Sequence, residues 1–218
     1  MKLARKKKDK TVEDAQDKAA QEEAEDIVAT IMALQTESSA DENSKSSRMI
    51  SMFGEIEEEK CGEIAYALRY LANIKKDGKA DPIEIIISTC GGSAADMFAV
   101  YDTIRLIRDE DCAVTTTGVG KIMSAGVLLL AAGSNGHRRI GANCRVMLHG
   151  VASGHIGQIY SLENELEEVR WVQDQYIKAL AVETDMTQKY IKKLIERKVN
   201  VYLTAKEAVE LGIADEVF

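Results

Sequence analysis

Two side chains suited to acyl-transfer chemistry stand at the ends of separate apolar runs. Ser124 follows a β-branched run at residues 113–119 and precedes an apolar helical stretch at residues 127–132. His149 follows a short strand-like run at residues 145–148. A serine hydroxyl becomes a good nucleophile when an adjacent base accepts its proton, and histidine is the usual base. We interpret the pair as a candidate nucleophile and general base.

Each of the two residues also has an ordinary structural interpretation. A serine before a helix is usually an N-cap, whose oxygen accepts backbone N–H bonds. A single histidine at a strand end is more often a surface or core residue than a base. The pair favours catalysis because a third feature, two adjacent glycines, precedes both.

The glycine pair Gly91-Gly92 lies between an apolar strand at residues 83–87 and an amphipathic helix. The apolar face of that helix is predicted to hold Met97, Val100, Tyr101, Ile104 and Ile107. Adjacent glycines let the backbone turn its N–H groups outward, where they suit a phosphate or a developing oxyanion. The turn lacks the lysine of a P-loop and the third glycine of a dinucleotide fingerprint. Acyl chemistry is therefore the better interpretation.

The elements that must position these groups are repeated strand–helix units. A first strand is predicted at residues 49–53, followed by a helix that carries on one face Ile64, Ala67, Leu68, Leu71 and Ile74. Thr204 and Glu207 form the capping box of the last helix. In open α/β sheets, ligands lie beyond the carboxyl ends of the strands, where the glycines, the serine and the histidine would gather.

Six short segments follow one another in a specific order along the chain. They are Ile87-Ser88-Thr89-Cys90-Gly91-Gly92, Tyr101-Asp102-Thr103-Ile104, Met123-Ser124-Ala125-Gly126, Leu129-Leu130-Ala131-Ala132-Gly133, Asn143-Cys144-Arg145-Val146-Met147-Leu148-His149, and residues 203–217. Together they resemble the ClpP family, the proteolytic subunits of Clp proteases. The resemblance runs from about Met49 to the C-terminus, as in a divergent member that a cell or a phage could encode. It implies an α/β fold, the ClpP or crotonase-like superhelix of strand–helix units, with a long handle helix at residues 159–183.

The resemblance also assigns roles within the site. Ser124 falls on the family's nucleophile and His149 on its general base, while the backbone amides of Gly92 and Ala125 fall on the oxyanion hole. The strand that pairs with the substrate backbone falls on residues 151–157. Its substrate-binding residues are Val151, Ala152, Ser153 and Gly154. The resemblance implies no cofactor and no metal ion.

The third member of the family's triad, an aspartate, is replaced by Asn200 in this chain. Asparagine can accept the Nδ1–H of His149 and fix its tautomer, but it has no charge to stabilise an imidazolium. In trypsin the equivalent change lowers kcat about 10⁴-fold, so we expect weakened activity. Asp185 or Glu196 could compensate for the missing charge. Asn200 could equally be an ordinary turn residue before a helix.

Two further positions depart from the family. Val199 takes the place of an arginine that couples contact between rings to triad geometry. Cys90 takes the place of a proline, which should leave the glycine turn less rigid. The four cysteines are far apart, without metal-ligand spacing, and we interpret them as reduced core residues. They are Cys61, Cys90, Cys112 and Cys144.

The implied function is that of a serine endopeptidase subunit that cleaves peptides and unfolded proteins. The resemblance implies a homo-oligomer of heptameric rings, stacked as a tetradecamer around a chamber, and an AAA+ unfoldase of the Clp ATPase type as partner. One alternative is a non-catalytic or weakly active ring subunit that completes a mixed assembly. Another is a crotonase-type enzyme acting on CoA thioesters, which leaves the pairing of Ser124 with His149 unexplained.

Composition narrows the class of protein. The chain of 218 residues is 45% apolar and has a formal net charge of −8. These values fit one globular domain with an extension and do not favour a nucleic-acid partner. No run of 18 apolar residues predicts a membrane span, and the basic start lacks the apolar core of a signal peptide. We expect a cytoplasmic protein that binds neither nucleic acid nor membrane.

Residues 1–48 differ from the rest in charge pattern. Residues 1–10 hold six basic side chains and one acidic one, whereas residues 11–48 hold ten acidic and three basic side chains. This pattern predicts a charged extension, partly helical or disordered, before a peptidase domain at residues 49–218. The extension is either a solvated arm or a gate or adaptor segment at a pore entrance.

Overall fold

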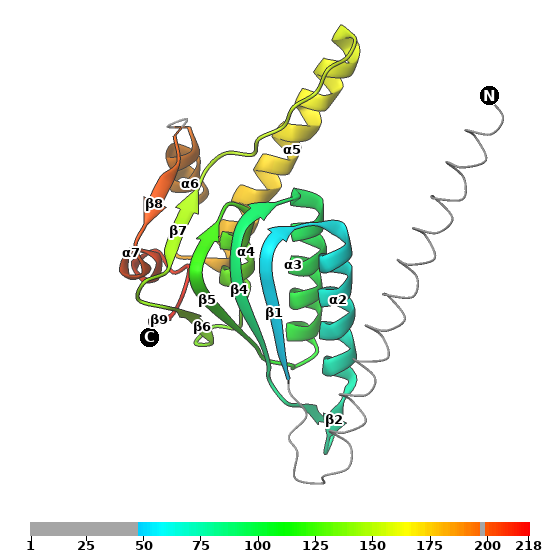
Figure 1. The fold of residues 1–218 in the computed structure, drawn as a ribbon, viewed down its shortest axis with the longest axis vertical. Helices are drawn as coiled ribbons and strands as arrows, with labels where there is room; N and C mark the ends of the chain where they lie inside the picture. The colour runs from blue at the N-terminus through cyan, green and yellow to red at the C-terminus, as the bar shows by residue number, and fades with distance from the viewer. Residues whose placement is uncertain (1–47, 197–198) are drawn as a thin grey trace, which may run out of the picture. The chain divides into compact units, whose positions relative to one another are not determined.

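Strands and helices alternate in the computed structural model, which describes residues 48–196 and 199–218 (Figure 1). The elements are β1 (Met49–Ile56), α2 (Glu58–Asn73), β2 (Lys75–Lys76), β3 (Lys79–Ala80), β4 (Ile83–Gly92), α3 (Ala94–Asp109), β5 (Val114–Met123), α4 (Ala125–Ala131), β6 (Arg138–Ile140), β7 (Arg145–Leu148), α5 (Ile159–Glu183), α6 (Gln188–Ile195), β8 (Val201–Leu203), α7 (Ala205–Glu210) and β9 (Glu216–Val217). The predicted extension, apart from Arg48, lies outside the described residues.

The main sheet in the described part of the chain has seven strands and is mostly parallel. Its strands follow the order β1-β4-β5-β6-β9, and β7 pairs with both β5 and β8. All of these pairings are parallel except β7 with β8, and the short β2–β3 hairpin stands apart from the main sheet. The predicted α/β class is confirmed.

Strand β5 changes its partner along its length, and this change positions the candidate nucleophile. Its first half pairs with β6, with Thr116 opposite Arg138, and its last residues pair with β7, with Met123 opposite Met147. The Ser124 N–H then donates to the Met147 carbonyl at 2.8 Å. The end of β5 therefore lies beside the strand that leads into His149.

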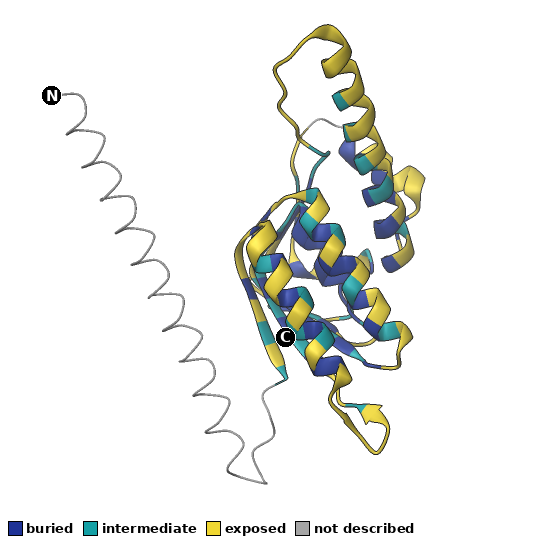
Figure 2. Ribbon diagram, turned by 90° about the vertical axis from the view of Figure 1, so that its right-hand side faces the viewer, coloured by how far each residue is buried: buried dark blue, intermediate teal, exposed yellow. Residues whose placement is uncertain are grey.

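Helices α2 and α3 cover one face of the sheet. On β4 the alternate residues Ile83, Ile85 and Ile87 are fully buried beneath them, as expected for a strand with one covered face. Figure 2 shows both helices with buried residues toward the sheet and exposed residues toward solvent. All five apolar residues predicted for the face of α3 are buried, which confirms that prediction.

The prediction for α2 is correct except at its end. Ile64, Leu68 and Leu71 are buried and Ala67 is partly buried, but the Ile74 side chain is 43% exposed. Ile74 is the residue after the helix, with an extended backbone at φ −79° and ψ 99°. Because the helical period ends at Asn73, Ile74 no longer shares the buried face.

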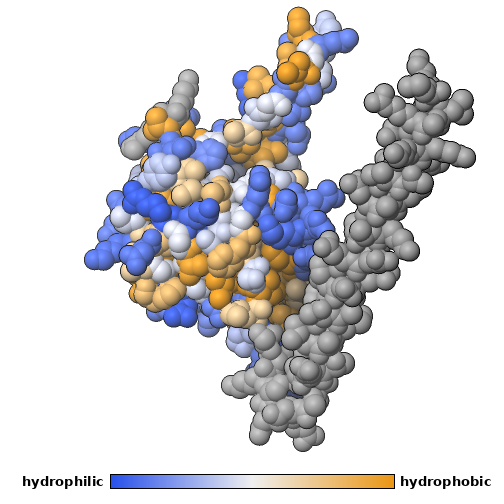
Figure 3. Space-filling model, viewed as in Figure 1, coloured by the Kyte–Doolittle hydropathy of each residue, from blue (hydrophilic) through white to orange (hydrophobic). Residues whose placement is uncertain are grey.

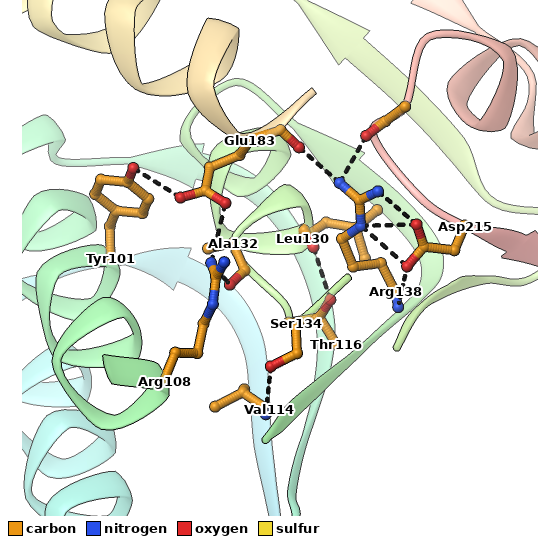
Figure 4. A network of polar contacts seen from close by, with 11 residues as sticks. Tyr101, Arg108, Val114, Thr116, Leu130, Ala132, Ser134, Arg138, Glu183 and Asp215 are labelled. Atoms are coloured by element: carbon orange, nitrogen blue, oxygen red, sulfur yellow. Dashed lines mark hydrogen bonds and ion pairs between the residues drawn. The ribbon is translucent and has the colours of Figure 1, made fainter. Parts of the chain in front are cut away.

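Glu183, at the end of α5, is buried with its carboxylate paired (Figure 4). It accepts a hydrogen bond from the Tyr101 hydroxyl at 3.0 Å and another from Arg108 Nη1 at 2.9 Å. Arg108 also donates to the Ala132 carbonyl at the end of α4, at 2.8 Å. Burial, and then the Glu183 charge, raise the pKa of Tyr101 to about 12. These bonds join α3, α4 and α5.

Arg138 on β6 makes a second buried network (Figure 4). Its Nε donates to both carboxylate oxygens of Asp215, at 3.1 and 3.0 Å. Its Nη1 donates to the carbonyls of Glu183 at 2.6 Å and Gly212 at 2.8 Å. Burial alone would raise the pKa of Asp215, but hydrogen bonds from Arg138 hold it below its ordinary value. The arginine thus ties β6 to the end of α5 and to the C-terminal segment.

Helix α5 matches the predicted handle, residues 159–183, and its first half projects from the sheet (Figure 1). Its buried residues lie near its C-terminal end, from Tyr176 to Glu183. Apolar side chains are exposed along the projecting part, among them Ile159 at 70% and Leu166 at 49% (Figure 3). Across the described ranges, none of the helices is long and apolar enough to cross a membrane.

Candidate active site

Ser124 stands on a strained turn between β5 and α4. Its backbone has φ 54° and ψ −122°, a region that residues other than glycine rarely adopt. Such a conformation costs on the order of 1–3 kcal/mol and is found mostly at functional sites. A nucleophile on a sharp strand-to-helix turn presents its side chain at the strand end. The Ser124 side chain makes no cap hydrogen bond, so it does not serve as the ordinary N-cap considered above.

The two glycines of the preceding turn are required by close packing. A Cβ on Gly91, which has φ +100°, would lie 2.6 Å from Ser124 Cβ. A Cβ on Gly92, at φ +153°, would lie 2.1 Å from the Ile56 carbonyl oxygen. Neither approach leaves room for a side chain. The end of β4 therefore packs directly against the serine, as an oxyanion site beside it requires.

A cavity of about 340 Å³, called here the nucleophile cavity, opens at this place. Its lining residues are Cys90, Gly92, Ser93, Ala94, Met97, Ser124, Ala125, His149, Gly150, Val151, Ala152 and Tyr176. It brings together the ends of β4, β5 and β7 with the N-terminus of α4 and one residue of α5. The structure thus collects the candidate nucleophile, base, oxyanion residues and the first two substrate-binding residues at one cavity.

The segment expected to bind the substrate backbone differs from the prediction. Residues 151–156 have no regular secondary structure, so the strand predicted at 151–157 is wrong for the single chain. Ser153 and Gly154 do not line the nucleophile cavity, and Ser153 instead donates to Glu165 of α5 at 3.2 Å. A strand needs hydrogen bonds to a partner strand, and this segment has none among the described residues. The Val151 N–H donates to the Gln173 side chain at 3.2 Å.

Asn200 lies opposite His149. Strands β7 and β8 pair antiparallel, with Leu148 opposite Val201, so the next pair outward in this register is His149 with Asn200. Both residues line a second cavity of about 350 Å³, called here the Asn200 cavity. Its lining residues are His149, Gly150, Val151, Gln173, Ile195, Glu196, Val199 and Asn200. His149 is therefore shared between the nucleophile cavity and the Asn200 cavity.

The two carboxylates considered as substitutes for the missing aspartate fall in different places. Glu196 lines the Asn200 cavity. Asp185 does not line this cavity. It packs against Gly212 instead, where an added Cβ would lie 2.7 Å from the Asp185 carboxylate. Glu196 is thus the better candidate for a compensating charge beside His149.

His149 shares one cavity with Ser124 and another with Asn200, but among the described residues no hydrogen bond joins His149 to either of them. Catalytic hydrogen bonds are often long before substrate binds and shorten in the reacting complex. The same described ranges contain no group of three or more His, Cys, Asp or Glu side chains that could hold a metal ion.

Half of the residues that line the nucleophile cavity were not predicted as site residues, among them Cys90 and Tyr176. Cys90 is exposed, which corrects its interpretation as a core residue. The other three cysteines are buried, and burial raises the pKa of Cys144 to about 11. Tyr176 is buried in α5 and its hydroxyl donates to the Ser124 carbonyl at 2.9 Å. Alternation along β4 places Cys90 on the outward face, but no sequence signal links Tyr176 to Ser124.

The predicted capping box at the start of α7 is confirmed. Thr204 Oγ1 accepts from the Glu207 N–H at 3.3 Å, and Glu207 accepts from the Thr204 N–H at 2.7 Å. The bond from the Thr204 N–H, and a second one that the Thr204 hydroxyl donates to the same carboxylate oxygen at 2.8 Å, lower the pKa of Glu207. We expect Thr204→Ala to lower the free energy of unfolding by about 1 kcal/mol in urea denaturation. Lys206→Ala, an exposed change in the same helix, is the control. Equal stability of the two variants would contradict the assignment.

Comparison with known proteins agrees with this geometry. The family model described as Clp protease matches residues 42–218. A similar curated protein is the ATP-dependent Clp protease proteolytic subunit 1 of Salinibacter ruber (strain DSM 13855 / M31). The two are 33% identical over 147 residues, which cover 67% of this chain and 61% of that protein. The chain thus aligns with less than two thirds of the relative's length.

Proposed function

The chain belongs to the Clp protease family, and we propose that it is a serine endopeptidase subunit that cleaves peptides and unfolded proteins inside an oligomeric chamber. One observation carries the proposal. Ser124 stands on a strained strand-to-helix turn, without a capping role, in the same cavity as His149 and the glycine turn. This is the arrangement that a nucleophile, its base and an oxyanion site need.

The proposed mechanism follows serine peptidase chemistry. His149 accepts the Ser124 hydroxyl proton as Oγ attacks a peptide carbonyl, and the amides of Gly92 and Ala125 stabilise the oxyanion. His149 then gives that proton to the leaving amine. A water molecule, activated by His149, hydrolyses the acyl-enzyme and regenerates the serine.

Asn200 is proposed as the orienting residue in this mechanism. The β7–β8 register and the shared Asn200 cavity support its place beside His149. An asparagine carbonyl can hold the neutral tautomer of the imidazole, but it stabilises the imidazolium less than a carboxylate does. We therefore expect turnover below that of a family member with aspartate at this position.

Substrate recognition is proposed to rest on Val151, Ala152, Ser153 and Gly154. The first two line the nucleophile cavity. Residues 151–156 lack regular structure, so their backbone groups can pair with an extended peptide, except the Val151 N–H, which donates to Gln173. Backbone pairing reads little sequence, so cleavage should be broad. Short peptides should enter unaided, whereas folded proteins should need an AAA+ unfoldase of the Clp ATPase type.

The oligomer is proposed as heptameric rings stacked in pairs. The exposed apolar residues on the projecting half of α5 support a role of this helix in subunit contact. A cytoplasmic location, and the lack of a nucleic-acid or membrane partner, are predictions from composition. The alternative, a weakly active or non-catalytic ring subunit in a mixed assembly, is motivated by Asn200 and Val199.

Labelling with a fluorophosphonate tests the proposed nucleophile. We expect the probe to modify the assembled protein at Ser124, as mapped by peptide mass spectrometry, because an activated serine displaces its leaving group. Ser124→Ala should abolish the label, and Ser51→Ala, an exposed serine on β1, should retain it. Correctly assembled rings that take no label at Ser124 would support the non-catalytic alternative instead.

A further inference from the structure

The Ser124 carbonyl is held by a side chain from a distant part of the chain. Tyr176 lies 52 positions later, in α5, and its hydroxyl donates to the Ser124 carbonyl oxygen at 2.9 Å. The tyrosine is 5% exposed and lines the nucleophile cavity. The Val127 N–H donates to the same oxygen at 3.0 Å. A carbonyl oxygen has two lone pairs, so both bonds can form together.

The held carbonyl and the Ala125 N–H belong to one peptide unit. The unit is planar and, like every peptide bond in the described residues, it is not cis, so its C=O and N–H point in opposite directions. Fixing the oxygen therefore fixes the direction of the N–H. As the first residue of α4, Ala125 has no intrahelical acceptor for this N–H. In the proposed function this amide is one of the two donors to the oxyanion.

We propose that Tyr176 is a positioning residue that holds the Ser124–Ala125 peptide so that the Ala125 amide faces the oxyanion. The inference rests on the proposed function and deepens it. Ser124 has a backbone conformation that relaxes unless neighbouring groups hold it. Its N–H is held by β7 through Met147 and its C=O by α5 through Tyr176, so two separate elements lock the turn.

The tyrosine hydroxyl also strengthens the amide as a donor. A hydrogen bond donated to a carbonyl polarises the peptide unit and makes its N–H a better donor. Burial raises the pKa of Tyr176 well above its ordinary value, so the hydroxyl remains protonated at any pH where the peptidase works. Tyr176 thus acts through Ala125 and does not need to contact the substrate's reacting atoms.

The effect should appear in kcat rather than in KM. An oxyanion forms only in the transition state, so a misdirected donor weakens transition-state binding and leaves ground-state binding nearly unchanged. Removal of a complete oxyanion donor costs about 10²- to 10³-fold in kcat. A donor that is retained but loosely held should cost less, about 10- to 100-fold.

The test compares Tyr176→Phe with Tyr101→Phe in the full-length assembled protein. Both changes remove a buried tyrosine hydroxyl that donates one hydrogen bond, but Tyr101 bonds Glu183 and lies outside the nucleophile cavity. We expect Tyr176→Phe to lower kcat for a fluorogenic peptide about 10- to 100-fold with KM within about twofold of wild type. A peptide boronate, whose tetrahedral adduct on Ser124 mimics the transition state, should lose affinity by a similar factor. Tyr101→Phe should keep wild-type kcat and boronate affinity.

Urea unfolding of both variants separates positioning from stability. Similar midpoints for the two, with a kcat loss in Tyr176→Phe alone, support the inference. A kcat for Tyr176→Phe equal to wild type, or an equal kcat loss in both variants, overturns it while leaving the peptidase assignment intact. A wild-type protein that neither hydrolyses the peptide nor takes the fluorophosphonate label overturns the proposed function, and the inference with it.

Discussion

Replacing His149 by alanine is expected to lower kcat for a short fluorogenic peptide by about 10³- to 10⁴-fold. General-base assistance contributes about 10²- to 10⁴-fold, and a serine hydroxyl without a base is a poor nucleophile. The histidine lines the nucleophile cavity together with Ser124. Steady-state kinetics on assembled protein measure the effect, and the loss should fall on kcat.

Two companion variants make this measurement specific. His137→Ala removes an exposed histidine in the turn before β6 and should keep wild-type kcat. The double variant Ser124→Ala with His149→Ala should be no worse than either single change, because residues that act as one unit are not additive. If His149→Ala retained more than half of the wild-type kcat, His149 would not be the base.

Installing an aspartate at position 200 is expected to raise kcat. In trypsin the loss of the orienting carboxylate costs about 10⁴-fold, which sets the upper limit for the gain. The gain should be at least about tenfold, because a carboxylate beside His149 stabilises the imidazolium that forms as Ser124 attacks. The adjacency of the two residues follows from the β7–β8 register and from the shared Asn200 cavity. The measurement is hydrolysis of the same peptide by wild type and Asn200→Asp.

Two control substitutions test whether a gain in kcat comes from the position of the new carboxylate. Asn135→Asp adds the same charge in an exposed turn and should leave kcat unchanged. Glu196→Gln tests whether the carboxylate in the Asn200 cavity already compensates, in which case it should lower wild-type turnover. Unchanged or reduced kcat in Asn200→Asp, together with wild-type turnover in Glu196→Gln, would show that Asn200 is an ordinary turn residue.

Most elements of the fold were predictable because their signals are local. Helix α5 has the predicted bounds, and the buried face of α3 and the capping box of α7 are as expected. Helical period and capping depend on residues three or four apart, which the sequence displays directly. The misplaced Ile74 has the same cause, since periodicity places a face but locates its end poorly.

The meeting of Ser124 and His149 at one cavity was predictable, but parts of their surroundings were not. Alternation along β4 could have placed Cys90 outside the core, since its neighbours at odd positions point inward. The strand expected at residues 151–157 requires a partner strand, which no local pattern supplies. The bond from Tyr176 to Ser124 depends on how α5 packs against α4.

The amino-acid sequence determined which residues could react, which elements carry them and that they follow strand ends, because reactivity and period belong to residue type and spacing. The tertiary structure decided which of these residues meet. The partner change of β5 lays Ser124 beside β7, and the antiparallel pairing of β7 with β8 sets Asn200 opposite His149. Strand pairing and helix packing join residues far apart in the chain, and their outcome depends on the whole core rather than on any short segment.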